Sequence, residues 1–78
     1  MMKNKTIGKL GYNLITERFG ILSKMDLWEV DGLHCGSSFE VLVNDEWVAD
    51  RIEMSKGKYY LVNSKISDDD LEGLKVRF

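Results

Sequence analysis

The sequence predicts a small, mainly all-β domain: an SH3-like barrel of about five to seven short antiparallel strands, with at most one helical turn. Three observations predict this class. The chain has 78 residues, the size of a single small domain covering residues 1–78. Apolar and polar residues alternate from Ser38 onward, which is the two-residue period of a strand. Proline is absent, and seven glycines separate short apolar runs, which disfavours long helices.

The N-terminal third predicts three short strands. Residues 8–12 and 18–22 both combine glycine with aromatic and aliphatic side chains, so we expect two strands joined through residues 13–17. A third β-like segment, residues 27–30, precedes the turn pair Asp31-Gly32.

The central third predicts a hairpin. Phe39, Val41 and Val43 share one strand face, and the following Asn44-Asp45 is a turn signal of moderate strength. The return strand, residues 47–54, changes its apolar preference midway. We therefore expect a bulge or bend in it, as small barrels require.

The C-terminal third predicts two more strands and the helical turn. Residues 55–58 are expected to form a turn, 59–62 a compact strand and 74–78 a last alternating strand. Ser67 is placed to cap one helical turn ending near Glu72, with Asp70 at the third position as in a capping box. We interpret the acidic residues of this turn as a solvated helix start, because they lack the spacing of a calcium loop.

Composition narrows the function classes. The formal net charge is −2 and the hydrophobic content 44%, which favours a folded domain and argues against a generic nucleic-acid binder. A single cysteine excludes an internal disulfide, and the basic N-terminus is not followed by an apolar signal segment. No apolar run approaches the length of a membrane span. These features predict a cytoplasmic protein without membrane contact.

The single histidine and the single cysteine, His34 and Cys35, do not predict catalysis. Neighbouring residues of an extended segment point to opposite faces, so the two side chains cannot easily form a nucleophile–base pair. They are also too few for a structural zinc site, unless two copies share one across a dimer. Otherwise we expect a buried cysteine and a histidine that hydrogen-bonds a turn. We predict no enzyme, no metal and no cofactor.

Two sets of residues are candidates for binding. The first combines aromatic and charged side chains near one hairpin, the composition of interface hot spots: Trp47, Arg51, Glu53, Tyr59 and His34. The second would form a basic patch if the two ends of the chain are adjacent: Lys3, Lys5, Lys9, Lys75 and Arg77. The simpler interpretations are that Trp47 caps the barrel beside a cross-strand ion pair, and that the lysines protect exposed strand edges.

One pattern resembles a known family: Gly-Leu-His-Cys-Gly at residues 32–36, Phe-Glu-Val at 39–41, Trp47-Val48 and Arg-Ile-Glu at 51–53. It is similar to short, uncharacterised domains of Firmicutes, often carried on plasmids, phages and integrative elements. The resemblance covers most of the chain and implies a small β-barrel-like fold and a bacterial, often mobile-element setting. It implies no activity. Asp45 departs from the glycine that the family favours in the hairpin turn.

These observations support two hypotheses. The first is a non-enzymatic interaction module that docks an unidentified protein partner through one barrel face. The alternative is a nucleic-acid-binding accessory protein of a mobile element, which would use the basic residues near the termini. Either could act as a monomer or as a weak homodimer, since thin domains gain stability by association.

Overall fold

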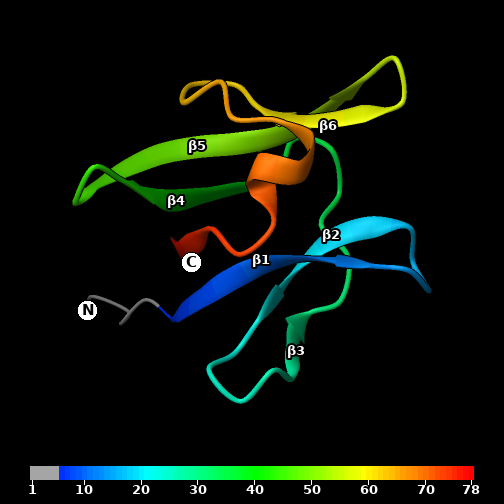
Figure 1. The fold of residues 1–78 in the computed structure, drawn as a ribbon, viewed down its shortest axis with the longest axis horizontal. Coiled ribbons are helices and arrows are strands. Elements are labelled where there is room, and N and C mark those ends of the chain that lie inside the picture. Colours follow the sequence, from blue (N-terminus) through cyan, green and yellow to red (C-terminus); the bar gives the residue numbers. More distant parts are fainter. Residues whose placement is uncertain (1–5) are drawn as a thin grey trace.

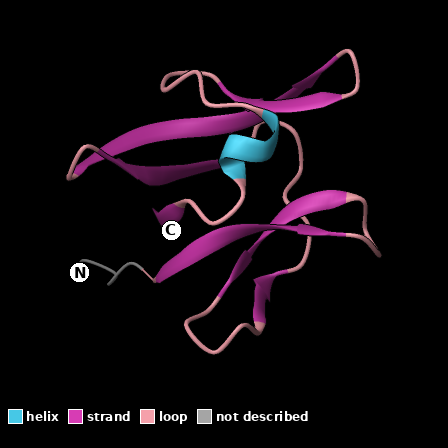
Figure 2. Cartoon of the chain, viewed as in Figure 1, coloured by secondary structure: helices cyan, strands magenta, loops and turns pink. Residues whose placement is uncertain are grey.

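A computed structural model describes residues 6–78 of the chain, and it contains seven strands and one short 3₁₀ helix (Figure 1). The elements in chain order are β1 (Ile7–Asn13), β2 (Arg18–Leu22), β3 (Trp28–Val30), β4 (Ser38–Val43), β5 (Glu46–Ser55), β6 (Lys58–Leu61), the 3₁₀ helix η1 (Asp68–Leu71) and β7 (Lys75–Arg77). Figure 2 shows that η1 interrupts an otherwise β architecture. The predicted fold class is therefore confirmed. No helix within residues 6–78 has the length and apolarity needed to cross a bilayer.

All neighbouring strands are antiparallel, and the sheet order is β3-β2-β1-β7-β4-β5-β6. The last strand thus lies at the centre of the sheet. Gly8 of β1 and Val41 of β4 are both register partners of Val76 in β7. The two ends of the described chain are therefore adjacent, which is the condition on which the predicted basic patch depends.

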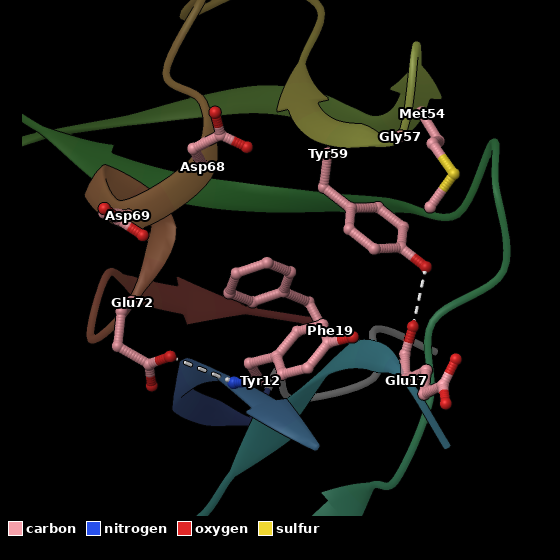
Figure 3. Close-up of a pocket in the computed structure, with 9 residues that line it drawn as sticks. All are labelled: Tyr12, Glu17, Phe19, Met54, Gly57, Tyr59, Asp68, Asp69 and Glu72. Atoms are coloured by element: carbon pink, nitrogen blue, oxygen red, sulfur yellow. Dashed lines mark hydrogen bonds between the residues drawn. The ribbon is translucent and has the colours of Figure 1, made fainter. Parts of the chain in front are cut away.

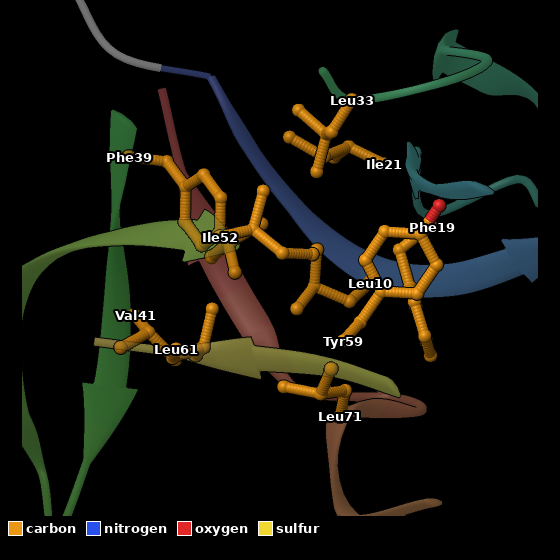
Figure 4. Packing of buried hydrophobic residues seen from close by; sticks show 11 residues of the cluster. Leu10, Phe19, Ile21, Leu33, Phe39, Val41, Ile52, Tyr59, Leu61 and Leu71 are labelled. Atoms are coloured by element: carbon orange, nitrogen blue, oxygen red, sulfur yellow. The ribbon is translucent and has the colours of Figure 1, made fainter. Parts of the chain in front are cut away.

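The sheet curls so that its two halves face each other across one core, with β1–β3 on one side and β4–β6 on the other (Figure 1). Among the described strands, β3 and β6 are the two ends of the sheet. Side chains from both halves fill the space between them (Figure 4). The fully buried members of this core are Leu10, Ile21, Val41, Ile52, Leu61, Leu71 and Val76.

The longest strand, β5, changes its pairing partner midway. Its first part, from Glu46 to Arg51, pairs with β4, and its second part, from Ile52 to Ser55, pairs with β6. This change agrees with the switch of apolar preference along the predicted return strand. β5 is therefore the strand that connects β4 to β6 in the curled sheet.

Both tight turns of this half form at the predicted positions. Asn44 and Asp45 have φ values of 50° and 65°, and Lys56 and Gly57 have φ values of 54° and 79°. Two consecutive positive φ angles are the type I′ geometry that matches the twist of a hairpin. The tight turn therefore forms although Asp45 occupies the position where glycine is favoured.

The helical turn is present, but the predicted capping box is not. Ser67 is the residue that precedes η1, and its side chain makes no capping hydrogen bond. The backbone N–H of Asp70 donates to the Ser67 carbonyl instead, at 3.1 Å. The prediction was wrong because Ser67 forms a bridge to Tyr60 of β6, which fixes its backbone as a strand-like partner.

A buried carboxylate fixes the loop that follows β6. Asp50 is only 4% exposed and accepts hydrogen bonds from the backbone N–H groups of Asn63, Ser64 and Arg51, at 2.8, 2.8 and 2.9 Å. Burial alone would raise the pKa of Asp50, but these N–H donors stabilise the carboxylate and lower the pKa below its ordinary value of 3.8.

Candidate functional site

A hollow lies between the β1–β2 hairpin and the β5–β6 hairpin, and η1 closes one end of it (Figure 3). We call it the aromatic groove. Its volume is about 760 Å³, in the range of ligand-binding clefts. The residues that line it are Tyr12, Glu17, Phe19, Met54, Gly57, Tyr59, Asp68, Asp69 and Glu72.

Three aromatic rings form the floor of the aromatic groove. Tyr12 and Phe19 are cross-strand partners, and their rings meet edge to face with centroids 5.3 Å apart. Phe19 meets Tyr59 in the same way at 5.6 Å. Tyr12 is 38% exposed, whereas Phe19 and Tyr59 are 6% and 9% exposed, so the floor is open to solvent at Tyr12 and at Met54, which pairs with Tyr59 and is 44% exposed. Rigid aromatic surface of this kind binds apolar or cationic groups.

A hydrogen bond joins the two hairpins across the groove. The hydroxyl of Tyr59 donates to the backbone carbonyl of Glu17 at 3.1 Å (Figure 3). Burial raises the pKa of Tyr59 above its ordinary value of 10, so this phenol is a neutral donor at neutral pH. The width of the groove is thereby fixed at this point.

Carboxylates border the groove on both sides of the rings. Asp68, Asp69 and Glu72 lie on the η1 side, and Glu17 lies at the far side, beside Tyr59 (Figure 3). Glu72 is held in place because its Oε1 accepts a hydrogen bond from the backbone N–H of Tyr12 at 3.1 Å. The acidic run therefore serves as one wall of a cleft, which the interpretation as a solvated helix start did not include.

The turn between β1 and β2 is rigid and carries two exposed aliphatic side chains. Asn13 is buried, and its amide donates to the Asp31 carbonyl while its oxygen accepts from the Ile15 backbone N–H. Leu14 and Ile15 at the tip are 82% and 93% exposed. The Asn13 side chain therefore holds the backbone at the start of the turn that exposes this apolar tip.

The structure does not bring the predicted partner-binding residues onto one surface. Along β5, Trp47, Arg51 and Glu53 alternate with the buried Ile52 and therefore lie on the outer side of the sheet. Tyr59 pairs with Met54 and lies on the inner side, in the aromatic groove. Only Tyr59 of the predicted set belongs to the groove.

The outer residues of that set form two separate contacts. The guanidinium of Arg77 lies over the Trp47 ring, 4.5 Å from its centroid, and Arg77 also pairs with Glu40 at 2.8 Å. The hydrogen bonds that Arg77 donates to the Glu40 carboxylate raise the pKa of Arg77 above its ordinary value. Arg51 pairs with Glu53 two residues along the same strand, at 3.3 Å, so the expected cross-strand pair is a same-strand pair.

His34 and Cys35 both lie exposed in the loop between β3 and β4. The expectation that Cys35 is buried is therefore wrong, because this loop runs over the surface before Gly36 rejoins β5 through a hydrogen bond to the Ile52 carbonyl. Within residues 6–78, no group of three or more potential metal ligands is assembled in one chain.

The predicted basic residues gather in part. Lys9 of β1 and Lys75 of β7 are directly opposite each other and, with Lys24, line a second hollow of about 180 Å³ on the outer side of the sheet. Lys9 forms an ion pair with Asp26 at 2.8 Å. Arg77 lies farther along β7 with Trp47 and Glu40. Lys3 and Lys5 lie outside the described residues.

Sequence reasoning missed most of the groove. Each strand by itself makes its groove residue look like an ordinary core residue: Tyr12, Phe19 and Met54. The contacts between these side chains depend on which strands lie side by side, and the sequence of one strand does not give that. The predicted five-residue turn, 13–17, would place Tyr12 opposite Arg18. In the structure β1 extends to Asn13, which pairs with Arg18, and this register puts Tyr12 opposite Phe19.

Comparisons with known proteins agree on the domain and assign no activity. A family model described as a domain of unknown function, DUF5348, matches residues 8–78. The chain is also similar to a protein from Ruminococcus gnavus of known crystal structure, with 40% sequence identity and a TM-score of 0.75. That similarity covers 92% of this chain and 99% of the other. No curated protein matched. Because the family model spans almost the whole described fold, the chain belongs to the DUF5348 family of domains of unknown function.

Proposed function

We propose that this domain is a non-enzymatic interaction module that binds an extended segment of a protein partner in the aromatic groove. The observation that carries the proposal is the floor of three edge-packed rings, which remains open to solvent at Tyr12 and Met54. Aromatic side chains in a preformed cleft give interfaces much of their affinity. Aromatic-lined grooves are also a recurring way to bind extended peptide segments.

Two further features support a protein partner. The hydrogen bond between Tyr59 and Glu17 fixes the groove before binding, so little ordering cost remains for the domain. The exposed tip at Leu14 and Ile15 belongs to the same hairpin as Tyr12 and extends the apolar surface beyond the groove. The absence of catalysis is part of the proposal and rests on the sequence, which has one histidine and one cysteine.

The test is affinity capture of the tagged domain from a Gram-positive lysate, after nuclease treatment, read by mass spectrometry. Three forms are compared: the wild type, Tyr12→Ala in the groove and Trp47→Ala on the outer face. We expect that the wild type and Trp47→Ala retain a protein and that Tyr12→Ala loses it. Of the two mutated residues, Tyr12 lies in the groove and Trp47 does not. Amide NMR spectra of both variants verify that they are folded.

A reversed pattern contradicts the groove. If Trp47→Ala abolishes capture and Tyr12→Ala does not, the docking surface lies on the outer side of the sheet. Retention by all folded forms would contradict both surfaces.

The second candidate function is nucleic-acid binding, in the setting of a mobile element. The observation that favours it is that Lys9 and Lys75 are opposite each other on adjacent strands, with Lys24 beside them. Phosphate contacts predict binding that falls steeply with salt. The expected result for this candidate is a mobility shift of a DNA or RNA probe at about 50 mM salt that is lost in Lys75→Glu. No shift for the wild type would contradict it.

A further inference from the structure

We infer that the segment bound in the aromatic groove carries an arginine or lysine side chain, which is held among the bordering carboxylates. This inference rests on the proposed function and specifies the chemistry of its partner. The groove has four carboxylates, those of Glu17, Asp68, Asp69 and Glu72, and the residues that line it within 6–78 include no lysine or arginine. This local excess of negative charge is larger than the formal net charge of the whole chain, which is −2.

Part of this negative charge is not used by the domain itself. Asp68 has a partner in Lys58, at 3.5 Å, but both side chains are solvent-exposed at 41% and 74%. Glu72 accepts a backbone N–H from Tyr12. Within the part of the chain that the structure describes, no ion pair engages Glu17 or Asp69. Two carboxylates, one at each side of the rings, are thus available to a ligand (Figure 3).

The aromatic floor and the acidic border favour the same kind of ligand. A cation over an aromatic face is attracted by the ring quadrupole, and it is attracted by the carboxylates as well. A guanidinium group suits this site because it stacks on rings and donates to carboxylates in a planar fork. An anionic ligand would meet this border of carboxylates, of which only Asp68 has a cationic partner, so the groove disfavours phosphate-rich partners.

The apolar part of the ligand has a place beside the cation. Met54 is 44% exposed at the β6 side of the groove, and Tyr12 is exposed in its middle. Met is flexible and adapts to ligand shape. We therefore expect a segment in which the cationic residue is flanked by apolar residues.

The experiment is an NMR titration of the ¹⁵N-labelled domain with two acetylated, amidated pentapeptides. One has the sequence Pro-Leu-Arg-Pro-Leu, and the other carries citrulline, a neutral isostere, in place of arginine. We expect the arginine peptide to shift the amides of Tyr12, Glu17 and Tyr59 and to bind roughly fivefold more tightly at about 50 mM salt, the effect of one partly exposed ion pair. The double variant Glu17→Gln/Asp69→Asn should remove this preference.

The outcomes separate this inference from the proposed function. If both peptides shift the groove amides with equal affinity, the groove binds peptides without charge selection and the inference fails alone. If neither peptide shifts these amides, or if the arginine peptide shifts residues around Lys9 or Trp47, the inference is contradicted, and the capture experiment with Tyr12→Ala then decides the proposed function. Lys75→Ser is the control, because Lys75 lies on the outer side of the sheet, away from the groove. If this variant also loses the preference for the arginine peptide over the citrulline peptide, the inference is contradicted.

Discussion

At the scale of single residues, Asp50 shows how one buried charge can organise a loop. Its two oxygens accept three backbone N–H groups, two of them from the segment after β6. A carboxylate supplies several acceptor sites, whereas a neutral amide supplies fewer and adds donors. The loop is therefore held by the charge of Asp50 and by its acceptor geometry together.

Asp50→Asn should lower the free energy of unfolding at pH 7 by about 2 kcal/mol, because an amide NH₂ would face a backbone N–H donor. The pKa of Asp50 is lowered in the folded state, so its contribution is present above the ordinary value of 3.8 and disappears as pH falls through the folded-state pKa. Urea unfolding at neutral and at strongly acidic pH should show the difference between wild type and variant shrinking in acid.

The matched control is Asp31→Asn, at an exposed loop position, which should change stability by less than about 0.5 kcal/mol. An Asp50→Asn variant as stable as the wild type at pH 7, or a difference that grows in acid, would contradict the role given to this carboxylate.

At the scale of elements, the β4–β5 turn combines a favourable geometry with an unfavourable residue. Asp45 has φ of 65°, in the left-handed region that costs energy for residues with a Cβ. Its neighbour Asn44 tolerates this region better than most residues. The turn therefore forms through the pairing of the two strands despite Asp45.

Asp45→Gly should stabilise the domain by about 0.5 kcal/mol, because Asn-Gly is the preferred pair for a type I′ turn and the strain at this position is relieved. Asp45→Val should destabilise it, since a β-branched side chain does not suit a positive φ. Thermal unfolding followed by circular dichroism gives the order of the three proteins. A glycine variant less stable than the wild type would show that Asp45 makes a contact worth more than its strain.

Elements of this chain were predictable where local pattern decides them. Phe39 and Val41 alternate with polar residues, and Asn44-Asp45 breaks the run, so strand, face and turn all follow from neighbours in sequence. The position of β7 between β1 and β4 depends on pairing over more than thirty residues, which no local pattern records. The groove was missed for the same reason, because Tyr59 meets Phe19 only through the curl of the sheet.

At the scale of the whole molecule, the two halves of the sheet are joined through β7. β1 and β4 are not neighbours in the sheet order, and both pair with β7. Val76 is fully buried at this junction. The groove lies between hairpins that belong to different halves, so its shape depends on the junction that β7 makes between them.

Val76→Asp should leave the chain unfolded, since an unpaired charge at a fully buried position costs more than about 4 kcal/mol, most of the stability of a small domain. Leu14→Asp is the same kind of change at an 82% exposed position and should be tolerated. Amide NMR dispersion distinguishes the two results. A dispersed spectrum for Val76→Asp would mean that the halves hold together without this junction.

The central place of β7 also has a consequence for biosynthesis. Ribosomes release a chain from its N-terminal end, so residues 75–77 emerge after the other six strands. Until then the β1–β2 and β4–β5 hairpins can form separately, each with an apolar face lacking its cover. Pairing of residues 75–77 with β1 and β4 is therefore expected to be the last step of folding during synthesis, because it joins the two separately formed hairpins.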